Sequence, residues 1–106
     1  RVGAAILTSE GKIYSGCNVE NVSYGLTMCA ERVSIFSAIS KKGAKDLRIR
    51  AIAVINDRNI YCAPCGACRQ VIIEFCDEDT IIFFQGEKGI EKVNAFDLMP
   101  SPFTKL

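Results

Sequence analysis

The sequence contains no histidine. This absence excludes Ser-His-Asp and Cys-His catalysis and every metal site with an imidazole ligand, so a metal would have to be held by Cys, Asp or Glu. No apolar run has the length of a membrane span, and no signal-peptide pattern is visible. The basic residues are scattered and the net charge is +1, so we expect neither a nucleic-acid partner nor a membrane partner.

The 106 residues have the size of one globular domain, which we expect to span 1–106. Apolar residues make up 49% of the chain and charged residues 24%, as is usual for a soluble protein with its own core. Six cysteines are too sparse for a disulfide scaffold and predict a reduced, cytoplasmic protein. Because the sequence opens at Arg1 and enters an apolar run at Val2, we expect further residues before this point.

Apolar periodicity and turn residues predict alternating strands and helices. Strands are expected at 2–8, 12–18, 49–55, 80–85 and 89–93, and helices at 28–39 and 66–75. Thr27 is the expected N-cap of the first helix and Gly43 its stop. The run at 49–55 is nearly continuous, which is typical of a strand covered on both faces. This alternation favours a layered α/β fold.

Three cysteines lie where these two helices are expected to begin: Cys29 in the first, and Cys65 and Cys68 in the second. Cys65 and Cys68 are three residues apart, so they share a helix face. A helix N-terminus lowers the pKa of a thiol and favours the thiolate that zinc requires. If the two helices lie side by side, the three thiolates converge, and a tetrahedral zinc ion then keeps one open position for water.

Two charged residues follow Cys29. Glu31 lies two positions further along and points away from the Cys29 side chain, so it need not be a ligand and could reach water or substrate beside the metal. A zinc ion with three thiolates carries a net negative charge, which weakens it as a Lewis acid. Arg32 and the helix N-termini are placed to offset this charge.

In these residues the chain resembles the small zinc-dependent cytidine deaminases, whose chemistry uses a three-cysteine zinc site and a glutamate that is not a ligand. The resemblance covers nearly the whole chain. Its blocks are Val2-Gly3-Ala4-Ala5, Gly16-Cys17-Asn18-Val19-Glu20-Asn21, Ser23-Tyr24-Gly25, Cys29-Ala30-Glu31-Arg32, Pro64-Cys65-Gly66-Ala67-Cys68-Arg69-Gln70 and Leu98-Met99-Pro100.

The resemblance implies a three-layer α/β/α fold with a central mixed sheet of about five strands, and one Zn²⁺ per chain. It also implies hydrolytic deamination of cytidine and deoxycytidine to uridine and deoxyuridine, a step of pyrimidine salvage. By resemblance Glu31 shuttles the protons, while Asn18 and Glu20 bind the ribose hydroxyls. The Ala30 N–H holds the ring carbonyl, and the Ala63 carbonyl meets the leaving amino group.

The family is typically a homotetramer with composite active sites. Tyr24 and Phe103 match positions that reach into the pocket of a neighbouring subunit. The family also has an N-terminal helix and an aromatic residue shortly before the segment that matches Val2, and neither is present in this sequence.

Other interpretations remain open. Cys62 forms an overlapping C-x-x-C with Cys65, so a closed four-cysteine structural zinc module without catalysis is conceivable, although it leaves Glu31 without a role. A blasticidin S deaminase would share the three-cysteine site. The nucleoside deaminases are the closer match at Gln70 and at the pair Asn18 and Glu20. A nucleic-acid deaminase is disfavoured by the lack of a basic patch and of the histidine ligand typical of that branch.

Overall fold

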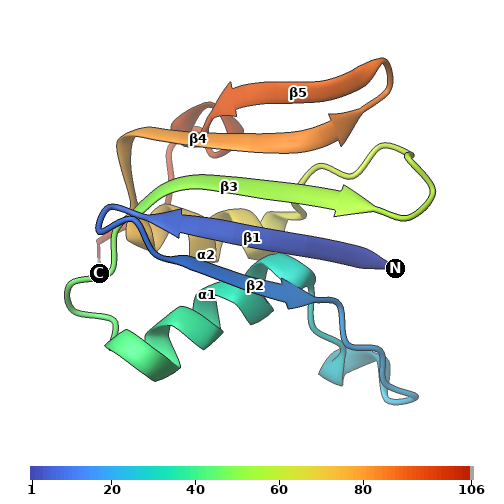
Figure 1. Ribbon diagram of the computed structural model, residues 1–106, viewed down its shortest axis with the longest axis horizontal. Coiled ribbons are helices and arrows are strands. Elements are labelled where there is room, and N and C mark those ends of the chain that lie inside the picture. The colour runs from blue at the N-terminus through green and yellow to red at the C-terminus, as the bar shows by residue number, and fades with distance from the viewer. Residues whose placement is uncertain (106) are drawn as a thin grey trace.

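The computed structural model describes residues 1–105, which form one five-stranded sheet in the order β2-β1-β3-β4-β5 (Figure 1). The strands are β1 (Val2–Thr8), β2 (Ile13–Cys17), β3 (Ile49–Asn56), β4 (Cys76–Gly86) and β5 (Gly89–Asn94). Neighbouring strands are antiparallel except for β3 and β4, which are parallel. The predicted mixed sheet is therefore confirmed, and four of its five strands lie within a residue or so of the expected bounds.

Two helices complete the fold: α1 (Ala30–Lys42) and α2 (Gly66–Phe75). The parallel pair β3 and β4 requires a crossover, and α2 supplies it. A loop at 57–65 leads from the carboxyl end of β3 into the start of α2, which is the edge of a sheet where ligands of α/β proteins usually bind. No helix among the described residues is both long and apolar enough to cross a membrane.

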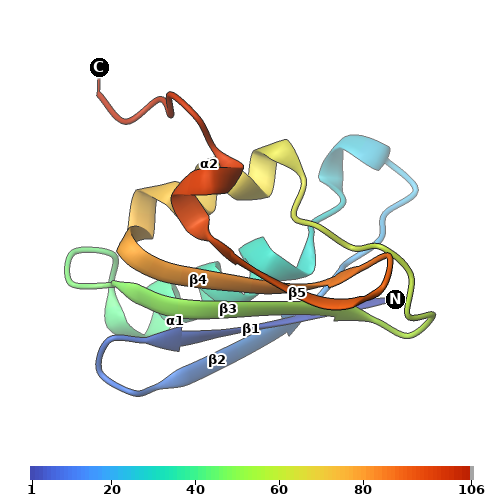
Figure 2. The same cartoon turned by 90° about the horizontal axis from the view of Figure 1, so that it is seen from above.

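Both helices lie on the same side of the sheet and contact each other (Figure 2). The core between them is aliphatic and fully buried, with Ile35 from α1, Ile72 from α2 and Ile52 from β3 at its centre. Gly16 lets β2 approach α1 closely, because a Cβ atom at this position would lie 2.7 Å from Val33 Cγ1 and 2.8 Å from the Ser34 nitrogen. The start of α1 is thus fixed against the sheet by backbone proximity.

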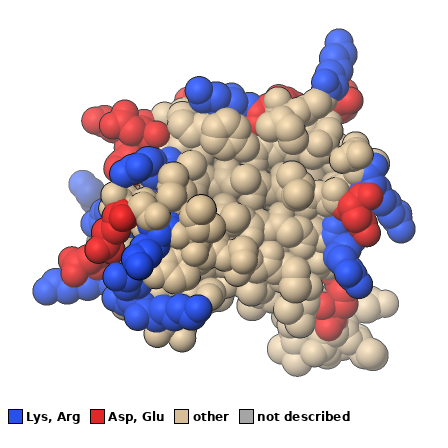
Figure 3. Space-filling model, viewed as in Figure 1, with Lys and Arg blue, Asp and Glu red and all other residues tan. Residues whose placement is uncertain are grey.

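No helix or loop within residues 1–105 covers the opposite face of the sheet. A shallow apolar hollow on it is lined by Ala5, Leu7, Ile13, Ala51, Ala53 and Phe83. Figure 3 shows that the middle of this side carries no charged residue, and that Lys, Arg, Asp and Glu gather at its edges. β3 was expected to be covered on both faces, yet Ile55 is 55% exposed. The second helical layer of the expected three-layer fold is therefore not supplied by the described residues.

The start of α1 differs from the prediction. The N-cap is Cys29 rather than Thr27, because the Thr27 hydroxyl donates to the Tyr24 carbonyl and closes a 3₁₀ turn at Tyr24–Leu26. Met28 is held in extended conformation by a bridge to Val19. α1 runs on to Lys42 and stops at the predicted Gly43, whose φ of 81° favours glycine.

Candidate metal centre and substrate cleft

Three cysteine sulfur atoms meet between the first turns of α1 and α2. The Sγ atoms of Cys29, Cys65 and Cys68 all lie within 4.8 Å of one another, and Cys29 Sγ is 3.9 Å from Cys65 Sγ. Cys29 and Cys65 are the N-cap residues of their helices, and neither thiol makes a capping hydrogen bond. Both thiols therefore remain free to turn toward the buried thiol of Cys68.

The spacing of these sulfur atoms fits zinc. With Zn–S bonds of about 2.3 Å, a tetrahedral ion separates its sulfur ligands by roughly 3.8 Å, close to the distance between Cys29 and Cys65. Among the described residues, the clustered cysteines are these three and do not include Cys62. The donor set thus fits one zinc ion per chain with a fourth position left for another ligand.

The thiols differ in acidity. Burial raises the pKa of Cys65, but the backbone N–H groups at the start of α2 and the neighbouring thiols favour the thiolate and outweigh this effect, so its pKa lies below the usual value. Burial raises the pKa of Cys68, and the charge of Glu31 adds to the increase. A cation bound here must therefore displace a proton that the protein alone holds on Cys68.

Arg32 lies against the sulfur cluster, as predicted. Its Nη2 donates to Cys29 Sγ at 3.3 Å, and its Nε is buried without a hydrogen-bond partner in the part of the chain that is described. Hydrogen bonds to Cys29 and Cys68 raise the pKa of the guanidinium, so Arg32 stays charged. The arginine therefore places positive charge beside the sulfur atoms, where it would offset the negative charge of thiolates.

Glu31 is 95% buried in the first turn of α1, next to Cys68 and Arg32. Burial raises the pKa of its carboxyl group, while its own backbone N–H, Cys68 and Arg32 act in the opposite direction. A carboxyl group whose pKa is raised above its ordinary value holds a proton more readily and can both accept and return one. This property suits acid–base chemistry beside a metal.

A cleft of about 260 Å³ opens in front of the sulfur atoms. Its wall brings together most of the residues singled out from the sequence, namely Asn18, Glu20, Cys29, Ala30, Glu31, Ala63 and Cys65, with Val2, Thr27, Met28 and Cys62. Cys68 lies behind them, in the buried part of the cluster. The cleft is slightly smaller than the roughly 300–1,000 Å³ of most ligand pockets, which suits a small polar molecule or a pocket with one wall missing.

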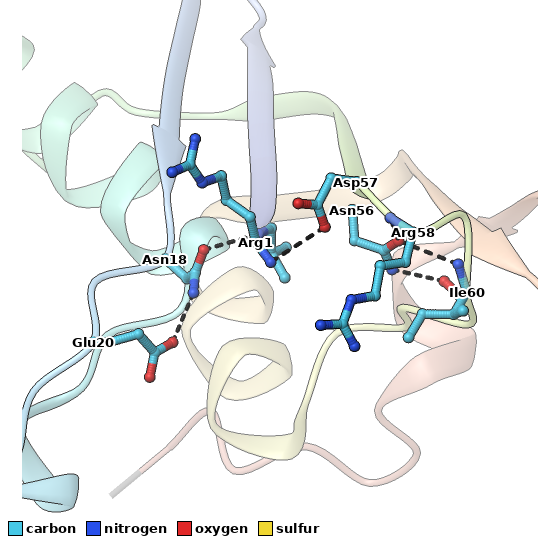
Figure 4. A network of polar contacts seen from close by, with 8 residues as sticks. Arg1, Asn18, Glu20, Asn56, Asp57, Arg58 and Ile60 are labelled. Atoms are coloured by element: carbon cyan, nitrogen blue, oxygen red, sulfur yellow. Dashed lines mark hydrogen bonds and ion pairs between the residues drawn. The ribbon is translucent and has the colours of Figure 1, made fainter.

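Asn18 and Glu20 are oriented by one another at the mouth of this cleft (Figure 4). Asn18 Oδ1 accepts from the Val2 N–H at 2.8 Å, and its Nδ2 donates to Glu20 Oε1 at 2.7 Å. These bonds leave the second carboxylate oxygen of Glu20 available to a ligand hydroxyl. The sequence did not reveal the link to Val2, because it joins residues that are 16 positions apart.

Tyr24 and Phe103 do not line this cleft. Tyr24 is 86% exposed in the 3₁₀ turn before α1, and Phe103 is 65% exposed in the C-terminal tail. The structure therefore brings together all of the predicted site residues except these two.

A second, polar hollow lies at the other end of β1, among Thr8, Glu10, Lys42, Asp46 and Arg48. It contains side chains of both charge signs, and Lys42 Nζ forms an ion pair with Glu10 Oε1 at 3.9 Å. No set of side chains converges there as the cysteines do, so the chemistry is expected at the sulfur cluster.

An open three-thiol centre with a buried carboxyl group, carried by a mixed α/β sheet, defines a metal-dependent enzyme. Comparison with known proteins narrows this class. The family model of the "Cytidine and deoxycytidylate deaminase zinc-binding region" matches residues 1–84. The chain therefore belongs to this deaminase family, which confirms the resemblance seen in its motifs.

Individual relatives agree with this assignment. The chain is 45% identical over 105 residues to the cytidine deaminase of Sporosarcina psychrophila, a match that covers 98% of this chain and 75% of that protein. The crystal structure of a cytidine deaminase from Burkholderia pseudomallei superposes with a TM-score of 0.82 at 42% sequence identity. This match covers 96% of this chain and 80% of that protein's chain. A blasticidin-S deaminase of Bacillus cereus is more distant, at 33% identity over 111 residues, 98% of this chain and 77% of that protein.

Proposed function

We propose that this protein is a zinc-dependent cytidine deaminase, a hydrolase acting on the C–N bonds of cyclic amidines. It adds water to cytidine or deoxycytidine and releases ammonia, leaving uridine or deoxyuridine. The observation that carries the proposal is the buried carboxyl group of Glu31, which lies in the same cleft as the three thiols and the Asn18 and Glu20 pair. A structural zinc site has no use for such an acid.

Glu31 is the proton carrier in this proposal. Cys29, Cys65 and Cys68 would hold the zinc ion, which when bound lowers the pKa of a water molecule and so makes it nucleophilic. Glu31 takes one proton of the water whose oxygen bonds to C4 and gives it to the ring nitrogen N3. It then takes the second proton, from the hydroxyl group now on C4, and delivers it to the amino group, which leaves as ammonia when the C4–N bond breaks and the C4 carbonyl forms. The raised pKa that burial gives Glu31 matches this two-way role.

Backbone groups orient the base. Ala30 is the first residue of α1, so its N–H has no acceptor within the helix and is free to bind the ring carbonyl. The Ala63 carbonyl would accept from the amino group that leaves. The segment before Pro64 is held in place because the Cys62 N–H donates to the Gln85 carbonyl at 2.8 Å.

Asn18 and Glu20 would bind the ribose. Their mutual hydrogen bond fixes the Glu20 carboxylate before any substrate arrives, and a preorganised acceptor discriminates strongly against ligands without the matching hydroxyl. Free cytosine should consequently react far more slowly than cytidine. Equal efficiency for the base and the nucleoside would remove Glu20 from substrate recognition.

The activity is tested with purified zinc-loaded protein and three substrates: cytidine, deoxycytidine and blasticidin S. We expect ammonia release from the two nucleosides and much less from the antibiotic. A preference for blasticidin S would make the protein an antibiotic deaminase. No turnover of any of the three, with zinc held by four cysteines, would make it a structural module.

We further propose a homotetramer in which each cleft is completed by a neighbouring chain. The segment before α1 exposes three apolar side chains, since Val22 is 98%, Tyr24 86% and Leu26 67% accessible. A cluster of this kind is typical of an interface, and symmetric closed assembly is the common outcome. The small volume of the cleft and the exposed ring of Phe103 support a wall shared between subunits.

Solution mass measurement combined with Phe103→Ala kinetics tests this assembly. We expect a tetramer and a higher KM for cytidine in the variant. A fully active monomer at assay concentration would end the composite-site proposal. A tetramer with unchanged cytidine affinity in Phe103→Ala would keep the assembly and remove Phe103 from the site.

We place the protein in the cytoplasm, in pyrimidine salvage. All six cysteines are free thiols, which supports a reducing compartment. Fractionation of the source cells with an antibody to the protein tests the location.

A further inference from the structure

Two half-buried side chains at the start of α2 tie together parts of the chain that are distant in sequence. Arg69 Nε donates to the Pro64 carbonyl at 2.7 Å, and Arg69 Nη1 donates to the Leu98 carbonyl at 3.2 Å. Next to it, Gln70 Nε2 donates to the Phe103 carbonyl at 2.8 Å. The first turn of α2 thus holds both the loop before it and the C-terminal tail.

Arg69 binds the chain on both sides of Cys65. Its backbone N–H donates to the Cys65 carbonyl at 2.9 Å, and its side chain grips the carbonyl of Pro64, the residue just before. Pro64 is itself fully buried. With both flanking carbonyls bound, the peptide planes around Cys65 are held in place, which fixes the direction of the Cα–Cβ bond from which Sγ reaches the cluster.

We propose that Arg69 is a positioning residue of the metal centre, which aims the Cys65 thiolate and fastens the tail to the same helix turn. The inference rests on the proposed zinc site and deepens it. Arginine suits the role because one rigid, planar guanidinium presents N–H groups in two directions, here toward Pro64 and Leu98. A lysine ammonium is a point charge and cannot reproduce this fork.

The role predicts a defect in metal retention. Groups that orient metal ligands typically contribute about 10–100-fold to metal affinity or activity. Loss of the Arg69 side chain frees the Pro64 carbonyl, so Cys65 samples orientations in which it does not face Cys29 and Cys68. Zinc should then dissociate faster, even though none of the sulfur atoms has been removed.

The experiment compares Arg69→Ala and Arg69→Lys with Arg50→Ala in the full chain. Arg50 is the matched control, since its Nη2 donates to the Ser9 carbonyl at 2.8 Å at the start of β3, the opposite end of the strand from the loop that leads to Cys65. Zinc release to a chromogenic chelator is followed under native conditions, and thermal unfolding is recorded for each variant. The visible absorption of the Co²⁺-substituted proteins reports ligand geometry without reference to turnover.

We expect release about 10–100-fold faster in Arg69→Ala, an intermediate rate in Arg69→Lys, and the parent rate in Arg50→Ala. The Co²⁺ spectrum should change in the Arg69 variants alone. Release from Arg69→Ala at the Arg50→Ala rate with an unchanged spectrum would overturn the proposal. If Arg69→Ala fails to fold, the same comparison is made with Arg69→Lys, and a parent-like result there would also overturn it.

Gln70→Ala separates the tail from the metal. This variant loses the bond to the Phe103 carbonyl but keeps both carbonyls around Cys65 bound. We expect parent-like zinc release together with a raised KM for cytidine at unchanged kcat. An unchanged KM would remove the tail from the inference. A protein that binds zinc as described but deaminates nothing would refute the proposed function and leave the role of Arg69 intact.

Discussion

Helices α1 and α2 both begin at an uncapped cysteine with extended backbone, and both carry an arginine in the first turn or just after it. The arginines point to different partners. Arg32 donates to the sulfur of Cys29, whereas Arg69 donates to two backbone carbonyls and to no sulfur. The same type of side chain, an arginine, therefore places charge beside a sulfur atom at α1 and binds backbone carbonyls at α2.

The two starts also differ in what they add to the cluster. α1 contributes one thiol and the buried acid Glu31, and it is pressed against β2 at Gly16. α2 contributes two thiols and no acid in its first turn. Chemistry is thus concentrated at α1, and ligand geometry at α2.

The largest effect is expected from ligand loss. Cys65→Ala leaves two thiols, so zinc should be lost and activity abolished. Cys62→Ala, three residues earlier and outside the cluster, should keep about one zinc per chain, as an open three-cysteine site requires. Metal analysis after gel filtration measures both. Metal-free Cys62→Ala protein would mean that Cys62, in the loop before α2, is also a zinc ligand.

Removing the acid should spare the metal. We expect Glu31→Gln to lower kcat by roughly 10²–10⁴-fold, the usual contribution of a general acid–base group, with zinc content unchanged. Glu74→Gln, an exposed position on α2, serves as the control and should behave as the parent. Near-normal kcat in Glu31→Gln would show that Glu31 on α1 is not the proton carrier.

Arg32→Ala sharpens the contrast between the two arginines. Without its charge the thiolates are less well neutralised, and kcat of the zinc-loaded protein should fall by about 10–100-fold. Arg32→Lys should recover part of this loss, because an ammonium can still approach Cys29. Steady-state kinetics at saturating zinc measure the effect. Identical kinetic and metal-release profiles for Arg32→Ala and Arg69→Ala would erase the distinction drawn here.

The smallest effect concerns how α1 is held. Gly16→Ala drives a methyl group into Val33 and the Ser34 backbone, so we expect unfolding to become easier by ~1–3 kcal/mol, as in other overpacked cores. Gly3→Ala is the matched control, since nothing lies within 4 Å of its Cβ position. Thermal or urea unfolding of the two variants gives the comparison. Equal stability would show that β2 yields to accommodate α1.

Much of this architecture was predictable because it is local. The bounds of α2 and Gly43 as the end of α1 follow from periodicity and stop signals. β4 begins at Cys76, four residues before the expected start. The prediction missed these residues because they are mostly polar, and they pair with β3 only through an irregular register next to Ile49. Periodicity detects the apolar part of a strand and misses such an extension.

The site was predictable as a set of residues but not as a network. Motif spacing placed Cys29, Cys65 and Cys68 at helix starts, and their convergence is confirmed. The bonds of Arg69 to Leu98 and of Gln70 to Phe103 span 29 and 33 positions and depend on where the tail lies in three dimensions. The signal that could have indicated them is a pair of long polar side chains directly after a ligand, on a helix whose other residues are largely apolar.

The uncapped helix starts have a consequence for the apoprotein. A serine or aspartate at an N-cap satisfies backbone N–H groups from within the chain, whereas the side chains of Cys29 and Cys65 make no capping hydrogen bond. Thiolate charge on these residues, which a bound cation would secure, can instead stabilise the positive ends of both helices. We therefore expect chelation to loosen the first turns of α1 and α2 together, so that their amide hydrogens exchange faster with solvent once zinc has left.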